Sequence, residues 1–97
     1  MANNAPMQID VKHNPELSRF EAIVDGEECV ADYRLADGVM VMTHTHVPPR
    51  LEGRGIAAKI VGSALDHARA HRLKVDPRCS YVRGYMRRHP DTQSLHV

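Results

Sequence analysis

Hydrophobic and polar residues alternate along three segments in the first part of the chain. Residues 18–24 place Phe20, Ala22 and Val24 on one face, and residues 8–12 alternate more weakly. Residues 29–35 repeat the pattern with an apolar face that comprises Cys29, Ala31, Tyr33 and Leu35. A period of two residues is typical of a half-buried β-strand. The pattern therefore predicts a strand in each segment.

Two short turns separate the strands that follow. Asp25-Gly26 and Asp37-Gly38 are the dipeptides that favour two-residue β-hairpin turns. The stretch Val39–Met42 is apolar on both faces, which is typical of a strand in the middle of a sheet. We therefore predict that the first half of the chain is an antiparallel meander.

The hydrophobic pattern changes after Pro48-Pro49. Apolar residues then recur at helical spacing from Ile56 to Ala68, and Leu73–Val75 is short and β-like. The stretch Cys79–Arg88 predicts a second, shorter helix that ends before His89-Pro90. The strand–helix–strand order predicts that the strands Val39–His46 and Leu73–Val75 are parallel. The expected fold class is α+β, with a mixed sheet formed by the meander and a β-α-β-α unit.

Length and composition limit the possible roles. The 97 residues are enough for one small domain, which we place at residues 7–97 after a disordered segment at residues 1–6. The net charge is +1 with acidic and basic residues interspersed, which argues against nucleic acid as a partner. No signal peptide or membrane-length apolar run is present, and the two cysteines lie far apart. These features predict a cytoplasmic protein with reduced thiols and no membrane partner.

The segment 47–60, VPPRLEGRGIAAKI, contains two glycines just before the predicted helix. It matches the dinucleotide fingerprint G-x-G-x-x-[GA], and Asp76 lies where an acid that binds ribose is expected. A dinucleotide domain, however, begins with this unit and continues for roughly 150 residues, whereas four predicted strands precede it here. A nucleotide P-loop is excluded because no Gly-Lys-Ser/Thr follows. A plain glycine cap with solvated arginines remains an alternative.

The wider pattern Arg50-x-x-Gly53-x-Gly55, between an apolar strand and a helix, resembles a known family motif. The segment Val39–Val61 looks like motif A of the GNAT superfamily of acyl-CoA-dependent N-acetyltransferases. The likeness to a subgroup of minimal GNAT-like proteins covers nearly the whole chain. It is carried by His44-Thr45-His46-Val47-Pro48, Leu51-x-Gly53-Arg54-Gly55-Ile56-Ala57, and Pro77-x-Cys79-Ser80-Tyr81-Val82 with Tyr85 and His89-Pro90.

This resemblance implies a fold and an acyl donor. The fold would be a truncated GNAT fold without the N-terminal helices that cover the acceptor site, because only residues 13–17 separate the first strands. Acetyl-CoA or coenzyme A would bind through its pyrophosphate at the glycines, where backbone N–H groups can approach a phosphate closely. The implied binding residues are His44, Thr45, His46, Val47, Arg50, Leu51, Gly53, Arg54, Gly55, Ile56, Ala57, Cys79 and Tyr81.

Three residues are candidates for the chemistry. Cys79 stands where many family members have an asparagine, and a thiol at a helix N-terminus can become a nucleophile, although a buried cysteine is often only a packing residue. Tyr85 is a candidate acid, one residue before the tyrosine position of the family. His46, with His44 on the same strand face, is either a base or a polar residue lining an open cleft. We predict no metal site, because the histidine pair has no third ligand at a recognisable spacing.

The resemblance therefore implies an acetyl-CoA-binding N-acetyltransferase with an unidentified amine or protein acceptor. The alternative is a coenzyme A binding module without turnover, which the missing acceptor-site helices favour. The open acceptor cleft could be completed by a second chain, which makes a homo-oligomer possible. No carboxylate is singled out as a general base, although Glu21, Glu28 and Asp32 are those that could face the cleft.

Overall fold

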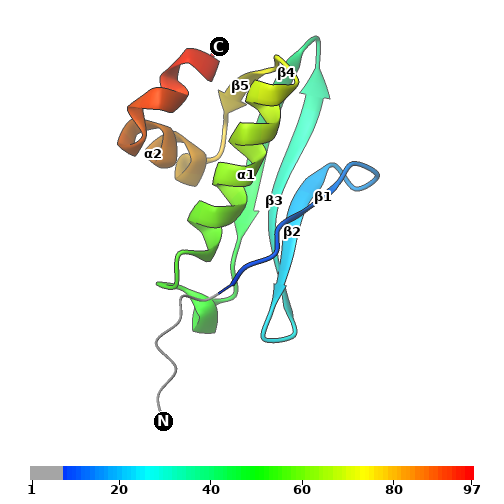
Figure 1. Ribbon diagram of the computed structural model, residues 1–97, viewed down its shortest axis with the longest axis vertical. Coiled ribbons are helices and arrows are strands. Elements are labelled where there is room, and N and C mark those ends of the chain that lie inside the picture. The colour runs from blue at the N-terminus through cyan, green and yellow to red at the C-terminus, as the bar shows by residue number, and fades with distance from the viewer. Residues whose placement is uncertain (1–7) are drawn as a thin grey trace.

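The computed structural model describes residues 8–97, and the segment predicted to be disordered, residues 1–6, lies outside them. Five strands form one sheet in the order β1-β2-β3-β4-β5 (Figure 1). The first three pairings are antiparallel and the fourth, between β4 and β5, is parallel. The predicted meander and the mixed sheet are therefore confirmed. The strands are β1 (Lys12–Asn14), β2 (Arg19–Val24), β3 (Glu27–Ala36), β4 (Val39–His46) and β5 (Lys74–Pro77).

Two α-helices follow the predicted pattern. Helix α1 (Ile56–Ala70) connects β4 to β5, and helix α2 (Ser80–Arg88) follows β5, with Cys79 as its N-cap residue. Two 3₁₀ helices, η1 (Pro49–Leu51) and η2 (Pro90–Leu95), were not predicted. Figure 1 shows α1 lying along the sheet and α2 beside it, on the side away from β1 and β2. Because β4 and β5 are parallel and each is followed by an α-helix, both α-helices begin near the same end of the sheet.

Three sequence-based expectations need correction. The first strand is Lys12–Asn14 and not residues 8–12, because the pairing with β2 begins at Lys12 opposite Glu21. Strand β5 continues to Pro77, and a proline is tolerated at the end of an edge strand because its missing N–H breaks no ladder there. Leu35 is not half-buried but 58% exposed, since it lies beside the turn at the end of the β3–β4 hairpin.

The core lies on one face of the sheet. Side chains that alternate along β2, β3 and β4 form a single buried cluster with both α-helices. The opposite face carries Arg19, which pairs with Glu21 at 2.6 Å and Glu28 at 3.2 Å, and Ile23, which is 63% exposed. Between β1 and β2 of the described chain there is a turn and no helix, as the truncated fold predicts. The main core residues are Phe20, Ala22, Cys29, Ala31, Met40, Met42, Leu51, Ile56, Ile60, Leu65, Val75, Val82 and Met86.

A β-bulge at Thr43 changes which face of β4 its last residues occupy. Met42 lies opposite Tyr33, but His44 lies opposite the next residue, Asp32, so that Thr43 has no partner on β3. An extra residue reverses the alternation of side chains beyond it. Thr45 consequently points to the helix side of the sheet, and His44 and His46 point to the opposite side.

A cluster of aromatic and imidazole rings joins β1 to α1. The His13 ring stacks on Phe20 with centroids 4.3 Å apart and meets His67 edge-on at 4.4 Å. His67 in turn stacks on His71 at 3.9 Å, and His13 Nε2 lies 2.5 Å from the Tyr33 hydroxyl. Burial, and then the neighbouring imidazoles, lower the pKa of His13 and His67 below the ordinary value of 6.5.

We expect this cluster to make stability depend on pH. Because the pKa values of His13 and His67 are lower in the folded state, the unfolded chain binds protons first as the pH falls below 6.5. The free energy of unfolding should therefore decrease between pH 7.5 and pH 5, as measured by urea denaturation. His67→Phe keeps a ring in the cluster without a titrating group, and it should reduce this decrease. An equal loss of stability in His67→Phe and the wild type would contradict the expectation.

Candidate functional site

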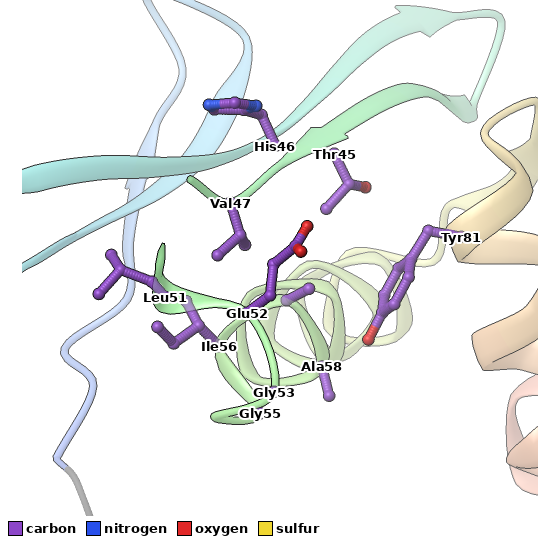
Figure 2. A pocket seen from close by; sticks show the side chains of 11 residues that line it. Thr45, His46, Val47, Leu51, Glu52, Gly53, Gly55, Ile56, Ala58 and Tyr81 are labelled. Carbon is purple, nitrogen blue, oxygen red and sulfur yellow. The ribbon is translucent and has the colours of Figure 1, made fainter. Parts of the chain in front are cut away.

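A cavity of about 490 Å³ lies between the end of β4, the glycine loop, the start of α1 and α2. Figure 2 shows its lining, with Thr45 and Val47 on one side, the glycine loop below and Tyr81 opposite. Nine residues that the sequence implicated in binding line it together with two that it did not. The nine are Thr45, His46, Val47, Leu51, Gly53, Gly55, Ile56, Ala57 and Tyr81, and the two are Glu52 and Ala58.

The two glycines give the cavity an open backbone floor. Gly53 and Gly55 have φ angles of +81° and +77°, a left-handed conformation that favours glycine. A Cβ added to either residue would meet nothing within 4 Å, so the space beside the backbone is free for a ligand. Because neither glycine has a Cβ, a ligand in the cavity can approach the backbone at Gly53 and Gly55 closely.

The first turn of α1 supplies backbone donors. Its first intrahelical hydrogen bond runs from the Lys59 N–H to the Gly55 carbonyl at 3.1 Å, so the N–H groups of the preceding residues are not used by the helix. Gly55, the N-cap residue, provides no side-chain cap, and no acidic residue lies in the first turn. Ile56, Ala57 and Ala58 all line the cavity. Free N–H groups at the positive end of a helix dipole are suited to binding an anion.

The two arginines of the loop are directed elsewhere. Arg54 pairs with Asp25 at 3.1 Å, and Arg50 pairs with Glu27 and donates to the Asp25 carbonyl at 3.1 Å. These contacts tie the loop to the β2–β3 turn, and neither arginine lines the cavity. Exposed ion pairs are weak, so either arginine can exchange its partner at little cost. Their predicted contact with a phosphate stays a prediction.

Cys79 is not one of the lining residues but lies beside the cavity, at the point where β4 and β5 separate. The Cys79 N–H donates to the Met42 carbonyl at 3.0 Å, and beyond this bond the described part of β5 offers no strand partner to residues 43–46. The Cys79 sulfur is 3.5 Å from the Thr45 hydroxyl across the gap. The separation of the strands thus places a thiol next to a free strand edge.

The surroundings of this thiol favour its charged form. Burial by itself would raise the pKa of Cys79, but the Thr45 hydroxyl and the backbone N–H groups of Val82, Tyr81 and Thr45 act against it. Together they lower the pKa of Cys79 below the ordinary value of 9.0. The second cysteine, Cys29, is fully buried in the core, and burial raises the pKa of its thiol. A reactive thiol is therefore expected at Cys79 and not at Cys29.

The other candidate residues fall outside the cavity or point away from it. Tyr85 packs its hydroxyl towards Gly62 on α1 and stacks on His89 at 3.9 Å. Burial, and then the nearby Asp66 and Asp91, raise the pKa of Tyr85. His44 does not line the cavity, and Figure 2 shows the His46 ring on the far side of the strand from Tyr81. His44 and His46 share a face as predicted, with ring centroids 6.3 Å apart.

The carboxylates that the sequence suggested for the cleft are not in it. Glu21 and Glu28 pair with Arg19 on the opposite face of the sheet, where Asp32 lies opposite His44. The carboxylate that does reach the cavity is Glu52, which sequence reasoning missed. Its position immediately before Gly53 was the available signal, because a loop that cradles a ligand exposes its own side chains to that ligand.

Residues 8–97 contain no group of three or more His, Cys, Asp or Glu side chains arranged to hold a metal ion. In the same part of the chain, no helix has the length and apolar character needed to cross a bilayer. What the site offers is backbone donors for an anion, a free strand edge and a thiol with a lowered pKa.

Comparisons with known proteins identify the family and the fold of the chain. The sequence profile of the GCN5-related N-acetyl-transferase family matches residues 19–95. Protein NATD1 of Gallus gallus is 30% identical over 105 residues, and the match covers 98% of this chain and 96% of that protein. Protein NATD1 of Mus musculus is 30% identical over 90 residues, and the match covers 90% of this chain and 82% of that protein. The solution structure of a GCN5-like protein from Staphylococcus aureus superposes with a TM-score of 0.72 at 23% identity, covering 91% of this chain and 87% of that one. The chain belongs to the GCN5-related N-acetyl-transferase family.

Proposed function

We propose that the cavity binds acetyl-CoA and that the protein transfers the acetyl group to an amine. The observation that carries the proposal is one continuous cavity that joins the glycine loop and the α1 N-terminus to the free edge of β4. A donor with a phosphate at one end and a thioester at the other requires this combination. Proteins of this family generally use acetyl-CoA as the donor.

The glycine loop is suited to the pyrophosphate of the donor. The positive φ angles and the free space at Gly53 and Gly55 leave the backbone exposed, and the N–H groups of Ile56, Ala57 and Ala58 lie at the positive end of the α1 dipole. Backbone donors in such a position bind a phosphate without any side-chain charge. The pantetheine arm would then follow the free edge of β4 towards Cys79.

Cys79 is suited to receive the acetyl group. Its thiolate would attack the thioester carbonyl, forming a new thioester on Cys79 and releasing coenzyme A, whose thiolate takes up a proton. The acceptor amine would then attack the carbonyl on Cys79, lose a proton and restore the thiol. The lowered pKa of Cys79 supports this role, because the thiolate is the attacking species.

A coenzyme A binding module without turnover remains the alternative. The observation that favours it is the exposed face of the sheet, where the described chain has no helices to cover an acceptor. The two functions share the glycine loop and differ in whether the bound donor reacts.

Binding and turnover can be measured separately. We expect calorimetry to detect acetyl-CoA binding, and we expect release of free thiol to accelerate when a panel of primary amines and lysine-containing peptides is added. Binding without amine-stimulated thiol release would support the binding module. No binding of either acetyl-CoA or coenzyme A would contradict both functions.

A further inference from the structure

The cavity that we propose for a polyanionic ligand has an acidic side chain in its lining. Among the eleven described residues that line the cavity, Glu52 is the one Asp, Glu, Lys or Arg. Figure 2 shows its carboxylate directed into the space below Thr45, between Val47 and Tyr81. Its backbone position is held by the bond from the Glu52 N–H to the Pro49 carbonyl at 3.2 Å.

The two arginines of the loop do not pair with Glu52. Arg50 and Arg54, on either side of Glu52, are paired with Asp25 and Glu27 of the β2–β3 hairpin. Within residues 8–97, the Glu52 carboxylate takes part in no ion pair or side-chain hydrogen bond. In this structure neither neighbouring arginine pairs with Glu52, and its carboxylate faces the cavity.

We propose that Glu52 limits the affinity of the site for phosphate-bearing ligands and thereby promotes release of coenzyme A. This inference rests on the proposed function, because it takes the pyrophosphate to lie at the adjacent glycines. The backbone donors of α1 attract the pyrophosphate, while the carboxylate one residue before Gly53 repels it. Coenzyme A and acetyl-CoA carry the same phosphates, so the repulsion weakens both.

The test is the affinity of Glu52→Gln for ligands with and without phosphates. Glutamine keeps the size of the side chain and removes the charge, and the residue is exposed, so the fold should not change. We expect Glu52→Gln to bind coenzyme A about tenfold more tightly than the wild type at low ionic strength. The gain should diminish as salt is added, because the charge is exposed to solvent. S-acetylpantetheine, which has no phosphate, should bind both proteins equally.

Glu16→Gln is the matched control, because Glu16 is an exposed glutamate in the β1–β2 turn and its removal changes the net charge equally. It should leave the affinity for coenzyme A unchanged. If the wild type binds coenzyme A and Glu52→Gln binds it no more tightly, the inference is wrong and the proposed function stands. If neither protein binds coenzyme A, both are wrong. Equal tightening in Glu16→Gln would also overturn the inference, because the effect would then come from net charge.

Discussion

Gly55→Ala is expected to weaken binding of acetyl-CoA by about 100-fold, as measured by calorimetry. Gly55 has a φ angle of +77°, and an added Cβ would enter the free space beside the backbone at the start of α1. It would keep a phosphate from one or two backbone N–H groups, each contributing roughly 1.5–3 kcal/mol to binding of a charged group. The loss of one such hydrogen bond at the upper end of this range, about 2.8 kcal/mol, corresponds to about a 100-fold change in Kd.

The left-handed backbone at Gly55 also costs stability when alanine is placed there, about 1 kcal/mol. Gly38→Ala is the matched control, because Gly38 has the same φ angle of +77° and the same open surroundings, but lies in the β3–β4 hairpin turn. Gly26 is less suitable, since it follows Asp25, which pairs with the loop arginines. The two alanine variants should unfold at similar urea concentrations, and Gly55→Ala alone should lose affinity. Equal affinity of both variants for acetyl-CoA would contradict the proposal that the glycine loop binds the pyrophosphate.

Cys79→Ala is expected to reduce acetyl transfer by at least about 100-fold, because the nucleophile is removed while the rest of the site remains. Acetyl-CoA should still bind, since the glycine loop and the α1 N-terminus do not involve this side chain. Incubation of the wild type with acetyl-CoA should add the mass of one acetyl group, and the variant should show no increase.

Cys29→Ala is the control for the second thiol. Cys29 is fully buried and its pKa is raised, so this variant should retain both the transfer rate and the acetyl adduct. Alkylation by iodoacetamide should likewise modify Cys79 first, and at a lower pH than an ordinary thiol. Full acetyl transfer by Cys79→Ala would show that the amine attacks the donor directly. The covalent step would then be abandoned while the binding proposal stands.

Most of the fold followed from local patterns in the sequence. The period-two segments, the two Asp-Gly turns and the helical spacing after Ile56 correctly predicted β2, β3, β4 and α1. The errors occurred at ends of elements, such as residues 8–11 and Pro77, where pairing with a neighbour decides whether a residue belongs to a strand. A pattern in one segment does not specify the register of its partner, so these boundaries were beyond sequence reasoning.

The lining of the cavity was also largely predictable, because its glycines and the start of α1 are adjacent in sequence. The directions of the charged side chains were not. Arg50 and Arg54 of the glycine loop pair with Asp25 and Glu27 of the β2–β3 hairpin, whereas Glu52 faces the cavity. Such contacts join residues far apart in the chain, and they depend on how the loop packs against the sheet.

The sequence by itself determined the order of strands and helices, the turns between them and the glycine-lined start of α1, because each depends on residues close together in the chain. The tertiary structure decided which side chains meet. The bulge at Thr43 turns Thr45 towards Cys79 and directs His44 and His46 to the other face. The β1–α1 packing likewise assembles the rings around His13. The physical reason is that strand register and side-chain packing are set by partners distant in sequence, where hydrophobic periodicity carries no information.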